Sequence, residues 1–418
     1  MSGGGCRAGF VALGVWASGC VLNPDFDPIE AGEQEASTAT SDTTTATESG
    51  TTSGTPADTE SPIDPLAPLD DPCPPLAPVE GPLVEVTPDQ ASQLQSIVAG
   101  AEPGTTILFQ PGTYAVPDGL WIETPDLSFR SSTGVPEDVV IDGGGQPETI
   151  FSPRASGITI AELTIMQARE HAVHLSGSST AIARGFLGYR LRILDNGSSA
   201  FKVNPSESGF DADDGVFACS QISVSANARA KFDSEQTCPN IGGFVGIATH
   251  GWHVRDNRIE GIWCPTGFAG GAIRFIESSA DPIVERNQIR DSVSGITFGV
   301  FEDGVPRREY QGDRCDGGFY DHYGGLVRNN VVTATGMGIA SSEFGFDSGI
   351  ALWQVCGPTV VHNTVVSAVP TFSSIEYRFS RTQATVVNNL VSHPILDRND
   401  AGVPVAGNLQ EVELSNFV

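Results

Sequence analysis

The sequence of 418 residues contains only two lysines, Lys202 and Lys231, so arginine carries almost all of its positive charge. Acidic residues outnumber basic ones by 51 to 22, which leaves a net charge of −29 at pH 7. A chain this acidic repels nucleic acid and anionic membrane surfaces. We therefore expect no nucleic-acid partner.

Several other features are missing from the sequence. No stretch approaches the roughly 20 consecutive apolar residues that a membrane span needs. A phosphate-binding glycine loop, an HExxH motif and a Ser-His-Asp motif are absent, which argues against nucleotide chemistry. Helix-favouring runs are scarce, whereas Gly, Val, Ile, Thr and Phe are plentiful, and this composition predicts turn-rich β structure.

The first twenty residues are typical of a targeting segment. Arg7 precedes a short apolar run at 9–16, and small residues stand directly before Cys20. The stretch resembles the lipobox of bacterial lipoproteins, although the usual leucine three positions before the cysteine is Ala17. The resemblance implies that Cys20 carries a lipid and holds the protein at the outer membrane or cell surface. A plain signal peptide or a misassigned start is the alternative.

Residues 21–81 contain no Lys or Arg and are dominated by Ser, Thr, Glu, Asp and Pro. Such a segment cannot bury enough apolar surface to offset its loss of conformational entropy. We predict a disordered acidic tether here, extended by repulsion between its own charges. The remaining residues, 82–418, are predicted to form one folded domain with no membrane contact except through the N-terminal lipid.

Six cysteines follow the targeting segment, and an exported chain is expected to oxidise them. Fifteen pairings are possible, and sequence alone does not choose among them. We favour Cys219–Cys238, which would close one long loop. No cysteine spacing resembles a zinc site. The six are Cys73, Cys219, Cys238, Cys264, Cys315 and Cys356.

A short phrase recurs five times between Trp252 and His393, as VRDN, VERN, VRNN, VVHN and VVNN. Spacings of 30, 43, 33 and 26 residues between its asparagines indicate a solenoid. We predict that the asparagines mark one corner of each coil and hydrogen-bond along the stack. Binding of sugar hydroxyls is the alternative. The asparagines are Asn257, Asn287, Asn330, Asn363 and Asn389.

The start of the folded domain carries a more specific pattern. A helix is predicted over 87–100, with Thr87 as its cap and Pro88 at its first position. AEPGTTILFQPGTYAV and LSFRSSTGVPEDVVIDGGG follow it. Together these stretches resemble the opening coil of right-handed parallel β-helix proteins of the pectate-lyase-like group, and the resemblance extends over about residues 82–409. It implies an all-β solenoid of single strands with an N-terminal capping helix.

The alternation of apolar residues predicts which side chains face outward. In AIRF, Ile273 and Phe275 point inward, so Arg274 points outward. The same reasoning applied to AVHL, AFKV, GITFG, GIALWQ and SIEYRF predicts one outer face that carries basic groups, a carboxylate and an indole. Such a face can bind an acidic sugar chain by charge and stacking, although salt bridges on a solvated sheet would have the same composition. Its predicted members are His174, Lys202, Arg274, Thr297, Trp353, Glu376 and Arg378.

Two predicted insertions break the coil period, one after Lys202 and one at 300–325. Insertions in solenoids usually fall on the binding face. The second is rich in ionisable and aromatic residues, and we expect it to fold over the basic stripe. These residues are Arg307, Arg308, Tyr310, Asp316, Asp321, His322 and Tyr323.

Two chemistries suit such a groove. Lyase-type β-elimination of an acidic polysaccharide needs a cation beside the uronate carboxylate and a base that removes the adjacent proton. Hydrolysis needs paired carboxylates. Asp213, Asp214, the Thr249–Gly251 triplet and Arg274 resemble parts of polygalacturonase motifs, but the Asn-Thr-Asp triplet and the terminal Arg-Ile-Lys are absent, so hydrolysis is less favoured. A non-catalytic glycan-binding or surface-interaction protein is the alternative to both.

The predicted site residues fall into three groups. Predicted catalytic residues are Lys202, Arg274, Tyr310, His322, Glu376 and Arg378. Predicted substrate-binding residues are His174, Trp353 and Arg308. The clustered oxygens of DADDG make calcium the one candidate ion, through Asp211, Asp213 and Asp214. We expect no required cofactor and a monomeric protein.

Overall fold

A computed structural model describes residues 72–310, 314–315, 317–398, 403, 405–406 and 408. The chain separates into two units, 1–67 and 68–418, and all described residues belong to the second. Cys20 and most of the predicted tether lie outside the described residues. In the part of the chain that is described, no helix is long and apolar enough to cross a membrane.

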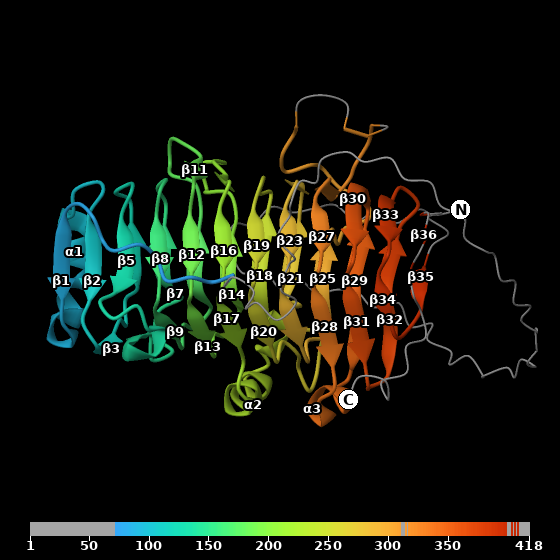
Figure 1. The fold of residues 1–418 in the computed structure, drawn as a ribbon, viewed down its shortest axis with the longest axis horizontal. Helices are drawn as coiled ribbons and strands as arrows, with labels where there is room; N and C mark the ends of the chain where they lie inside the picture. The colour runs from blue at the N-terminus through green and yellow to red at the C-terminus, as the bar shows by residue number, and fades with distance from the viewer. Residues whose placement is uncertain are drawn as a thin grey trace, which may run out of the picture. The chain divides into compact units, whose positions relative to one another are not determined.

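Three long sheets of parallel strands build the second unit, and most coils contribute one short strand to each sheet. Figure 1 shows the coils stacked from β1 to β36. This is the predicted right-handed parallel β-helix. We call the three sheets A, B and C in the order in which the chain enters them.

Sheet A contains fourteen strands. Its strands are β1 (Leu83–Val86), β2 (Thr106–Phe109), β5 (Ser128–Ser131), β8 (Thr159–Ala161), β12 (Leu187–Tyr189), β16 (Val216–Ala218), β19 (His253–Arg255), β22 (Ser279–Ala280), β23 (Ile283–Glu285), β26 (His322–Tyr323), β27 (Leu326–Arg328), β30 (Val355–Val361), β33 (Gln383–Val387) and β36 (Val405–Ala406).

Sheets B and C contain ten strands each. Sheet B is formed by β3 (Gly112–Ala115), β6 (Val139–Asp142), β9 (Thr164–Met166), β13 (Arg192–Leu194), β17 (Gln221–Ser223), β20 (Arg258–Glu260), β24 (Gln288–Arg290), β28 (Val331–Ala334), β31 (Thr364–Ser367) and β34 (Leu390–Val391). Sheet C is formed by β4 (Leu120–Ile122), β7 (Thr149–Pro153), β10 (His171–Leu175), β14 (Ser199–Val203), β18 (Gly242–Ile247), β21 (Ile273–Ile276), β25 (Ser294–Phe298), β29 (Phe346–Trp353), β32 (Thr371–Arg378) and β35 (Ile395–Asp397).

The remaining elements lie at the coil corners and at the N-terminal end. A small sheet pairs β11 (Ala183–Arg184) with β15 (Ala212–Asp213). The helices are η1 (Pro88–Gln93), α1 (Leu94–Gly100), η2 (Pro136–Asp138), α2 (Ala226–Ser234), η3 (Cys238–Asn240) and α3 (Met337–Ala340). The predicted helix over 87–100 is therefore η1 followed by α1, and it lies at the end of the solenoid next to β1 (Figure 1).

The asparagine ladder is confirmed. Each buried asparagine donates its side-chain amide to the Oδ1 atom of the next, at 3.0 Å from Asn257 to Asn287 and 2.9 Å from Asn287 to Asn330. The series continues through Asn363 and Asn389. The residue before each asparagine adopts a left-handed backbone, as at Asp256, Arg286, Asn329, His362 and Asn388. The ladder thus satisfies buried polar groups at the sharp turn from sheet A to sheet B.

Aromatic side chains fill the interior at regular intervals. Phe201 and Phe244, one coil apart, stack with ring centroids 5.2 Å apart, and Phe275 follows at 5.4 Å from Phe244. All three are buried. Because each coil buries its apolar side chains against the coils on either side, one core runs through the solenoid.

Three disulfides among the described residues correct the predicted pairing. Cys219 pairs with Cys73, and Cys238 pairs with Cys264, so the predicted Cys219–Cys238 bond is wrong. The third bond joins Cys315 to Cys356. The first one fixes a segment that was predicted to be tether, because residues near Cys73 lie along the outer face of sheet A. There Tyr189 donates its hydroxyl to the carbonyl of Pro74 at 2.7 Å.

The first predicted insertion is mostly an additional coil. Between Lys202 and sheet C of the next coil, the chain forms β16 in sheet A and β17 in sheet B. Only the loop 204–215 and the segment containing α2 depart from the regular coil. VFA and QIS, which were predicted to lie within the insertion, are therefore strands.

Candidate functional site

The outer face of sheet C carries the predicted stripe. The strand register aligns His174 with Lys202 and Arg274 with Thr297, and Val245 links the two pairs. Further along, Thr297 is aligned with Ala351 and then with Glu376. The inward neighbours of Arg274, Ile273 and Phe275, are fully buried. The predicted phase is therefore confirmed for β21, whereas Thr297 and Glu376, which were also predicted to face outward, are buried.

The stripe is long, and its members do not converge on one point. Neighbouring strands lie about 4.8 Å apart, so two steps separate Lys202 from Arg274 by about 10 Å. Three more steps, or about 14 Å, separate Arg274 from Glu376. His174, Lys202 and Arg274 are half-buried and remain accessible to a ligand, whereas Val245, Thr297 and Glu376 are buried.

Lys202 and His174 form the best-defined pair in the stripe. Burial lowers the pKa of Lys202, and nearby Arg307 lowers it further, while Glu170 acts in the opposite direction. Burial and then Lys202 lower the pKa of His174 to about 4, so this ring is neutral at pH 7. Its Nε2 atom contacts Oδ1 of Asn204. A half-buried amine with a lowered pKa can act as a general base.

Arg274 occupies a space that a glycine provides. A Cβ atom built on Gly270 would lie 2.9 Å from Nη2 of Arg274, so any other residue at this position would displace the guanidinium. The guanidinium therefore lies back along the strand, toward the corner where the chain enters sheet C.

The C-terminal end of the stripe is closed by ion pairs. Glu376 is fully buried, and its Oε1 atom lies 3.2 Å from Nη1 of Arg398 in the next coil. Arg378 lies over the ring of Trp353, 5.3 Å from its centroid. Burial, and then Glu376, raise the pKa of Asp347 to about 6. Glu376 thus makes the structural ion pair that the sequence left open, and it is not presented to a ligand.

The loop after β25 is tied to the loop before β16 by one arginine. Arg308 donates to both carboxylate oxygens of Asp213, at 2.7 and 2.8 Å, and lies 3.3 Å from Asp211. Asp214 pairs with Arg184. The three carboxylates predicted to bind calcium therefore pair with arginine. Among the described residues, no group of three or more His, Cys, Asp or Glu side chains is arranged to hold a metal ion.

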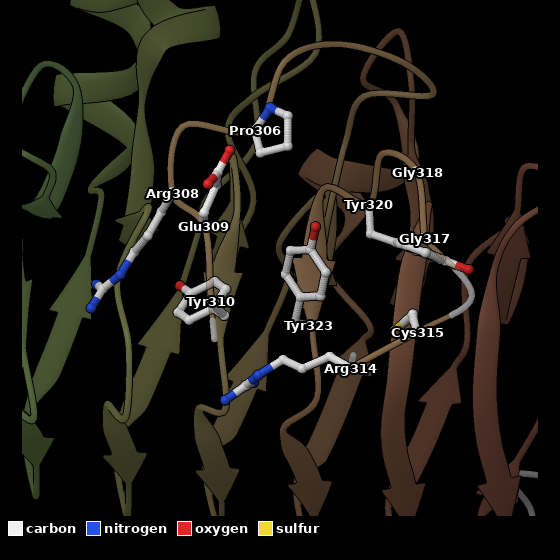
Figure 2. A pocket seen from close by; sticks show the side chains of 10 residues that line it. All are labelled: Pro306, Arg308, Glu309, Tyr310, Arg314, Cys315, Gly317, Gly318, Tyr320 and Tyr323. Carbon is white, nitrogen blue, oxygen red and sulfur yellow. The ribbon is translucent and has the colours of Figure 1, made fainter. Parts of the chain in front are cut away.

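A cavity of about 230 Å³ opens within this second insertion (Figure 2). Tyr310 lies in it with Arg308 5.2 Å and Arg314 4.8 Å from the ring centroid. Its hydroxyl donates to the carbonyl of Ser278 at 2.6 Å, and burial raises its pKa. Figure 2 shows Arg308 pointing out of the cavity. Both predicted residues therefore hold the loop in place.

His322 is in the interior, which corrects its prediction as a groove residue. It belongs to β26, is fully buried, and stacks on Phe298 with ring centroids 4.1 Å apart. Burial lowers its pKa to about 3. The insertion ends earlier than predicted, since the chain has already re-entered sheet A at this point. Asp316 lies outside the described residues.

Arg307 links the insertion to the stripe and was predicted only as a member of the loop. It pairs with Glu277, which follows β21, and it is close enough to Lys202 to lower the pKa of that residue. The insertion therefore reaches the stripe through Arg307 on one side and the acidic loop through Arg308 on the other.

One exposed residue of this face was missed. Trp121 lies between buried Leu120 and Ile122 in β4, and its side chain is 49% exposed. The alternation in LWI could have shown that Trp121 points outward, because the same rule placed Arg274.

Comparison with solved structures agrees with the fold. No family profile and no curated protein matches this sequence. The native crystal structure of a GH136 lacto-N-biosidase from Eubacterium ramulus aligns with a TM-score of 0.54 and 10% identity, over 79% of this chain and 68% of that chain. Its selenomethionine derivative gives 0.52 and 10%, over 80% and 68%. At such low identity, the similarity establishes a shared fold and nothing further.

Proposed function

We propose that this chain binds an acidic polysaccharide along the outer face of sheet C and cleaves it by β-elimination. The alignment of His174, Lys202 and Arg274 in one outward row is the observation that carries the proposal. Arg274 supplies positive charge to this row and Arg307 lies close to Lys202, so the row can pair with the carboxylates of a uronate polymer. A glycosidase of solved structure shares the β-helix architecture, which supports a carbohydrate ligand.

The reaction assigns a base and a cation to residues of this row. Lys202, whose pKa is lowered by burial, takes in its deprotonated form the proton from the carbon next to the uronate carboxylate, and a carbon–carbon double bond forms. The glycosidic carbon–oxygen bond breaks, and the departing oxygen takes a proton from solvent. Arg274 or Arg307 neutralises the carboxylate, which makes the adjacent proton easier to remove. Calcium supplied from solution could serve in place of one of these cations.

The test uses the two lysines of the chain. Purified protein is incubated with a panel of acidic glycans, with and without calcium, and unsaturated product is followed by ultraviolet absorbance. Lys202→Ala is expected to lower the rate at least a hundredfold, whereas Lys231→Ala, on the exposed side of α2, leaves it unchanged. Absence of product on every glycan with the wild-type protein would overturn the lyase assignment.

A non-catalytic glycan-binding protein is the second candidate. The ion pairs around the stripe favour it. Glu376 pairs with Arg398 and Glu277 pairs with Arg307, so neither carboxylate is available as a catalytic group. In that case acidic glycans bind without cleavage, and affinity falls as salt screens the basic row. Binding without product, measured on the same glycan panel, would select this candidate.

We also propose that the protein is exported and anchored at the cell surface by a lipid on Cys20. The three disulfides support an oxidising compartment. Mass spectrometry of the protein from membranes tests the anchor, because Cys20→Ala should release an unlipidated form.

A further inference from the structure

Trp121 stands at the start of the outward row that contains Lys202. The register aligns Trp121 with Ser152 on the next coil, and Phe151 with Val173 on the coil after that. His174 and then Lys202 continue the row. Three steps of about 4.8 Å place Trp121 about 14 Å from Lys202 along the solenoid. The indole is therefore in line with the proposed site.

The backbone of Trp121 is held rigidly although β4 is the first strand of its sheet. Gln95 of α1 accepts a hydrogen bond from the Trp121 backbone N–H at 2.8 Å and donates one to its carbonyl at 3.2 Å. The amide of Gln95 thus takes the place of a neighbouring strand. This arrangement fixes the backbone that carries the exposed indole before any ligand binds, which lowers the entropy cost of binding.

Arg154 brings positive charge to the same place. Its guanidinium carbon lies 4.3 Å from the centroid of the Trp121 ring, although about half of the Trp121 side chain remains exposed. Among the described residues, Trp121 is the only tryptophan that is exposed; Trp252 is buried, and Trp263 and Trp353 are half-buried. A large exposed aromatic surface beside a cation is typical of a binding site for a ligand with apolar and anionic parts.

We infer that Trp121 and Arg154 form a terminal subsite for one acidic sugar unit of a chain that also contacts Lys202. The indole stacks against the pyranose ring, and Arg154 pairs with the carboxylate of that unit or the next. The subsite rests on the proposed function, because the remaining sugar units occupy the row from His174 onward. The subsite predicts that long oligosaccharides bind better than short ones, because only chains that extend about 14 Å beyond Lys202 reach Trp121.

The experiment measures affinity as a function of chain length. Uronate oligosaccharides from the disaccharide to the octasaccharide are titrated calorimetrically into the Lys202→Ala protein, which prevents turnover. Affinity is expected to rise with length and then reach a plateau. Trp121→Ala should lower the affinity of long chains roughly tenfold or more and leave that of short chains unchanged, while Trp121→Phe retains most of it. Leu83→Ala, which changes a side chain of similar exposure on β1, is the matched control.

The outcomes separate the two proposals. Equal affinities of Trp121→Ala and its parent for every length overturn the subsite and leave the proposed function standing. Equal losses for short and long chains also overturn it, because they indicate a general structural effect, and thermal unfolding of the variant identifies that case. Failure of the parent and the wild-type protein to bind any acidic oligosaccharide overturns both.

Discussion

Single residues on sheet C show how burial sets the electrostatics of this acidic protein. Burial lowers the pKa of Lys202 and of His174, and it raises the pKa of Asp347. Desolvation disfavours whichever form is charged. The face that looks simply basic in the sequence therefore contains one group, His174, that is neutral near pH 7.

The raised pKa of Asp347 predicts a stability that depends on pH. Its pKa is about 6 in the folded protein and 3.8 ordinarily, so the folded state holds this proton more tightly. The resulting contribution to the free energy of unfolding is complete below about pH 4 and is lost as the pH rises through about 6. Glu376, Arg398 and Arg378 face the same carboxyl.

Replacement of this carboxyl by an amide tests whether stability falls with rising pH as predicted. The free energy of unfolding of the wild type is expected to fall by about 1–3 kcal/mol between pH 4 and pH 7, and Asp347→Asn should abolish this fall. Denaturant unfolding at each pH measures it. Asp118→Asn, at an exposed position before β4, serves as the control. A variant whose stability falls with pH as steeply as that of the wild type would contradict the assignment.

At the scale of elements, the two long loops behave as one unit because Arg308 joins them. Arg308 is 16% exposed and Asp213 is fully buried, so the pair is shielded from water. Breaking a buried pair leaves an uncompensated charge, and we expect Arg308→Met to cost about 3 kcal/mol. Faster hydrogen exchange at both 204–215 and 300–310 is the specific signature.

An exposed ion pair provides the control for this prediction. Arg290 lies 3.3 Å from Asp291 and is 57% exposed, so Arg290→Met should cost less than about 1 kcal/mol. If only the loop that contains Arg308 exchanged faster, the coupling between the loops would be refuted.

The strands and corners could be predicted because the local pattern determines them. Alternation in AIRF and GITFG decides which side chains enter the core, and the repeated asparagine fixes where each coil turns. His322 could not be placed, because a two-residue strand within an insertion has no alternation to detect. The partners of Glu376 and Asp213 were equally hidden, since Arg398 and Arg308 are brought to them by the stacking of coils.

At the scale of the whole molecule, the disulfide between Cys73 and Cys219 encloses the first part of the solenoid. The two cysteines are 146 residues apart in the sequence. Closing a loop of this size should contribute about 2–5 kcal/mol to the free energy of unfolding, through the entropy of the unfolded chain. The double variant Cys73→Ser with Cys219→Ser should therefore unfold at lower denaturant concentration.

Proteolysis distinguishes this effect from a loss of fold. In the double variant, residues near Cys73 should be cleaved rapidly, while the strands of sheet C stay protected. The double variant Cys238→Ser with Cys264→Ser, which opens a loop of only 26 residues, should lose less stability. An intact N-terminal segment in the first variant would show that contacts such as Tyr189 with Pro74 suffice.

The same bond has a mechanical consequence. A solenoid ordinarily unravels from its ends, because a terminal coil has only one neighbour. Here the chain that leads into β1 first crosses sheet A and is bonded to Cys219 beside β16. A force applied to the chain before Cys73 is therefore delivered to the middle of the solenoid, and the coils from β1 to β15 carry none of it. The N-terminal coils, which would otherwise unfold first, therefore bear no force.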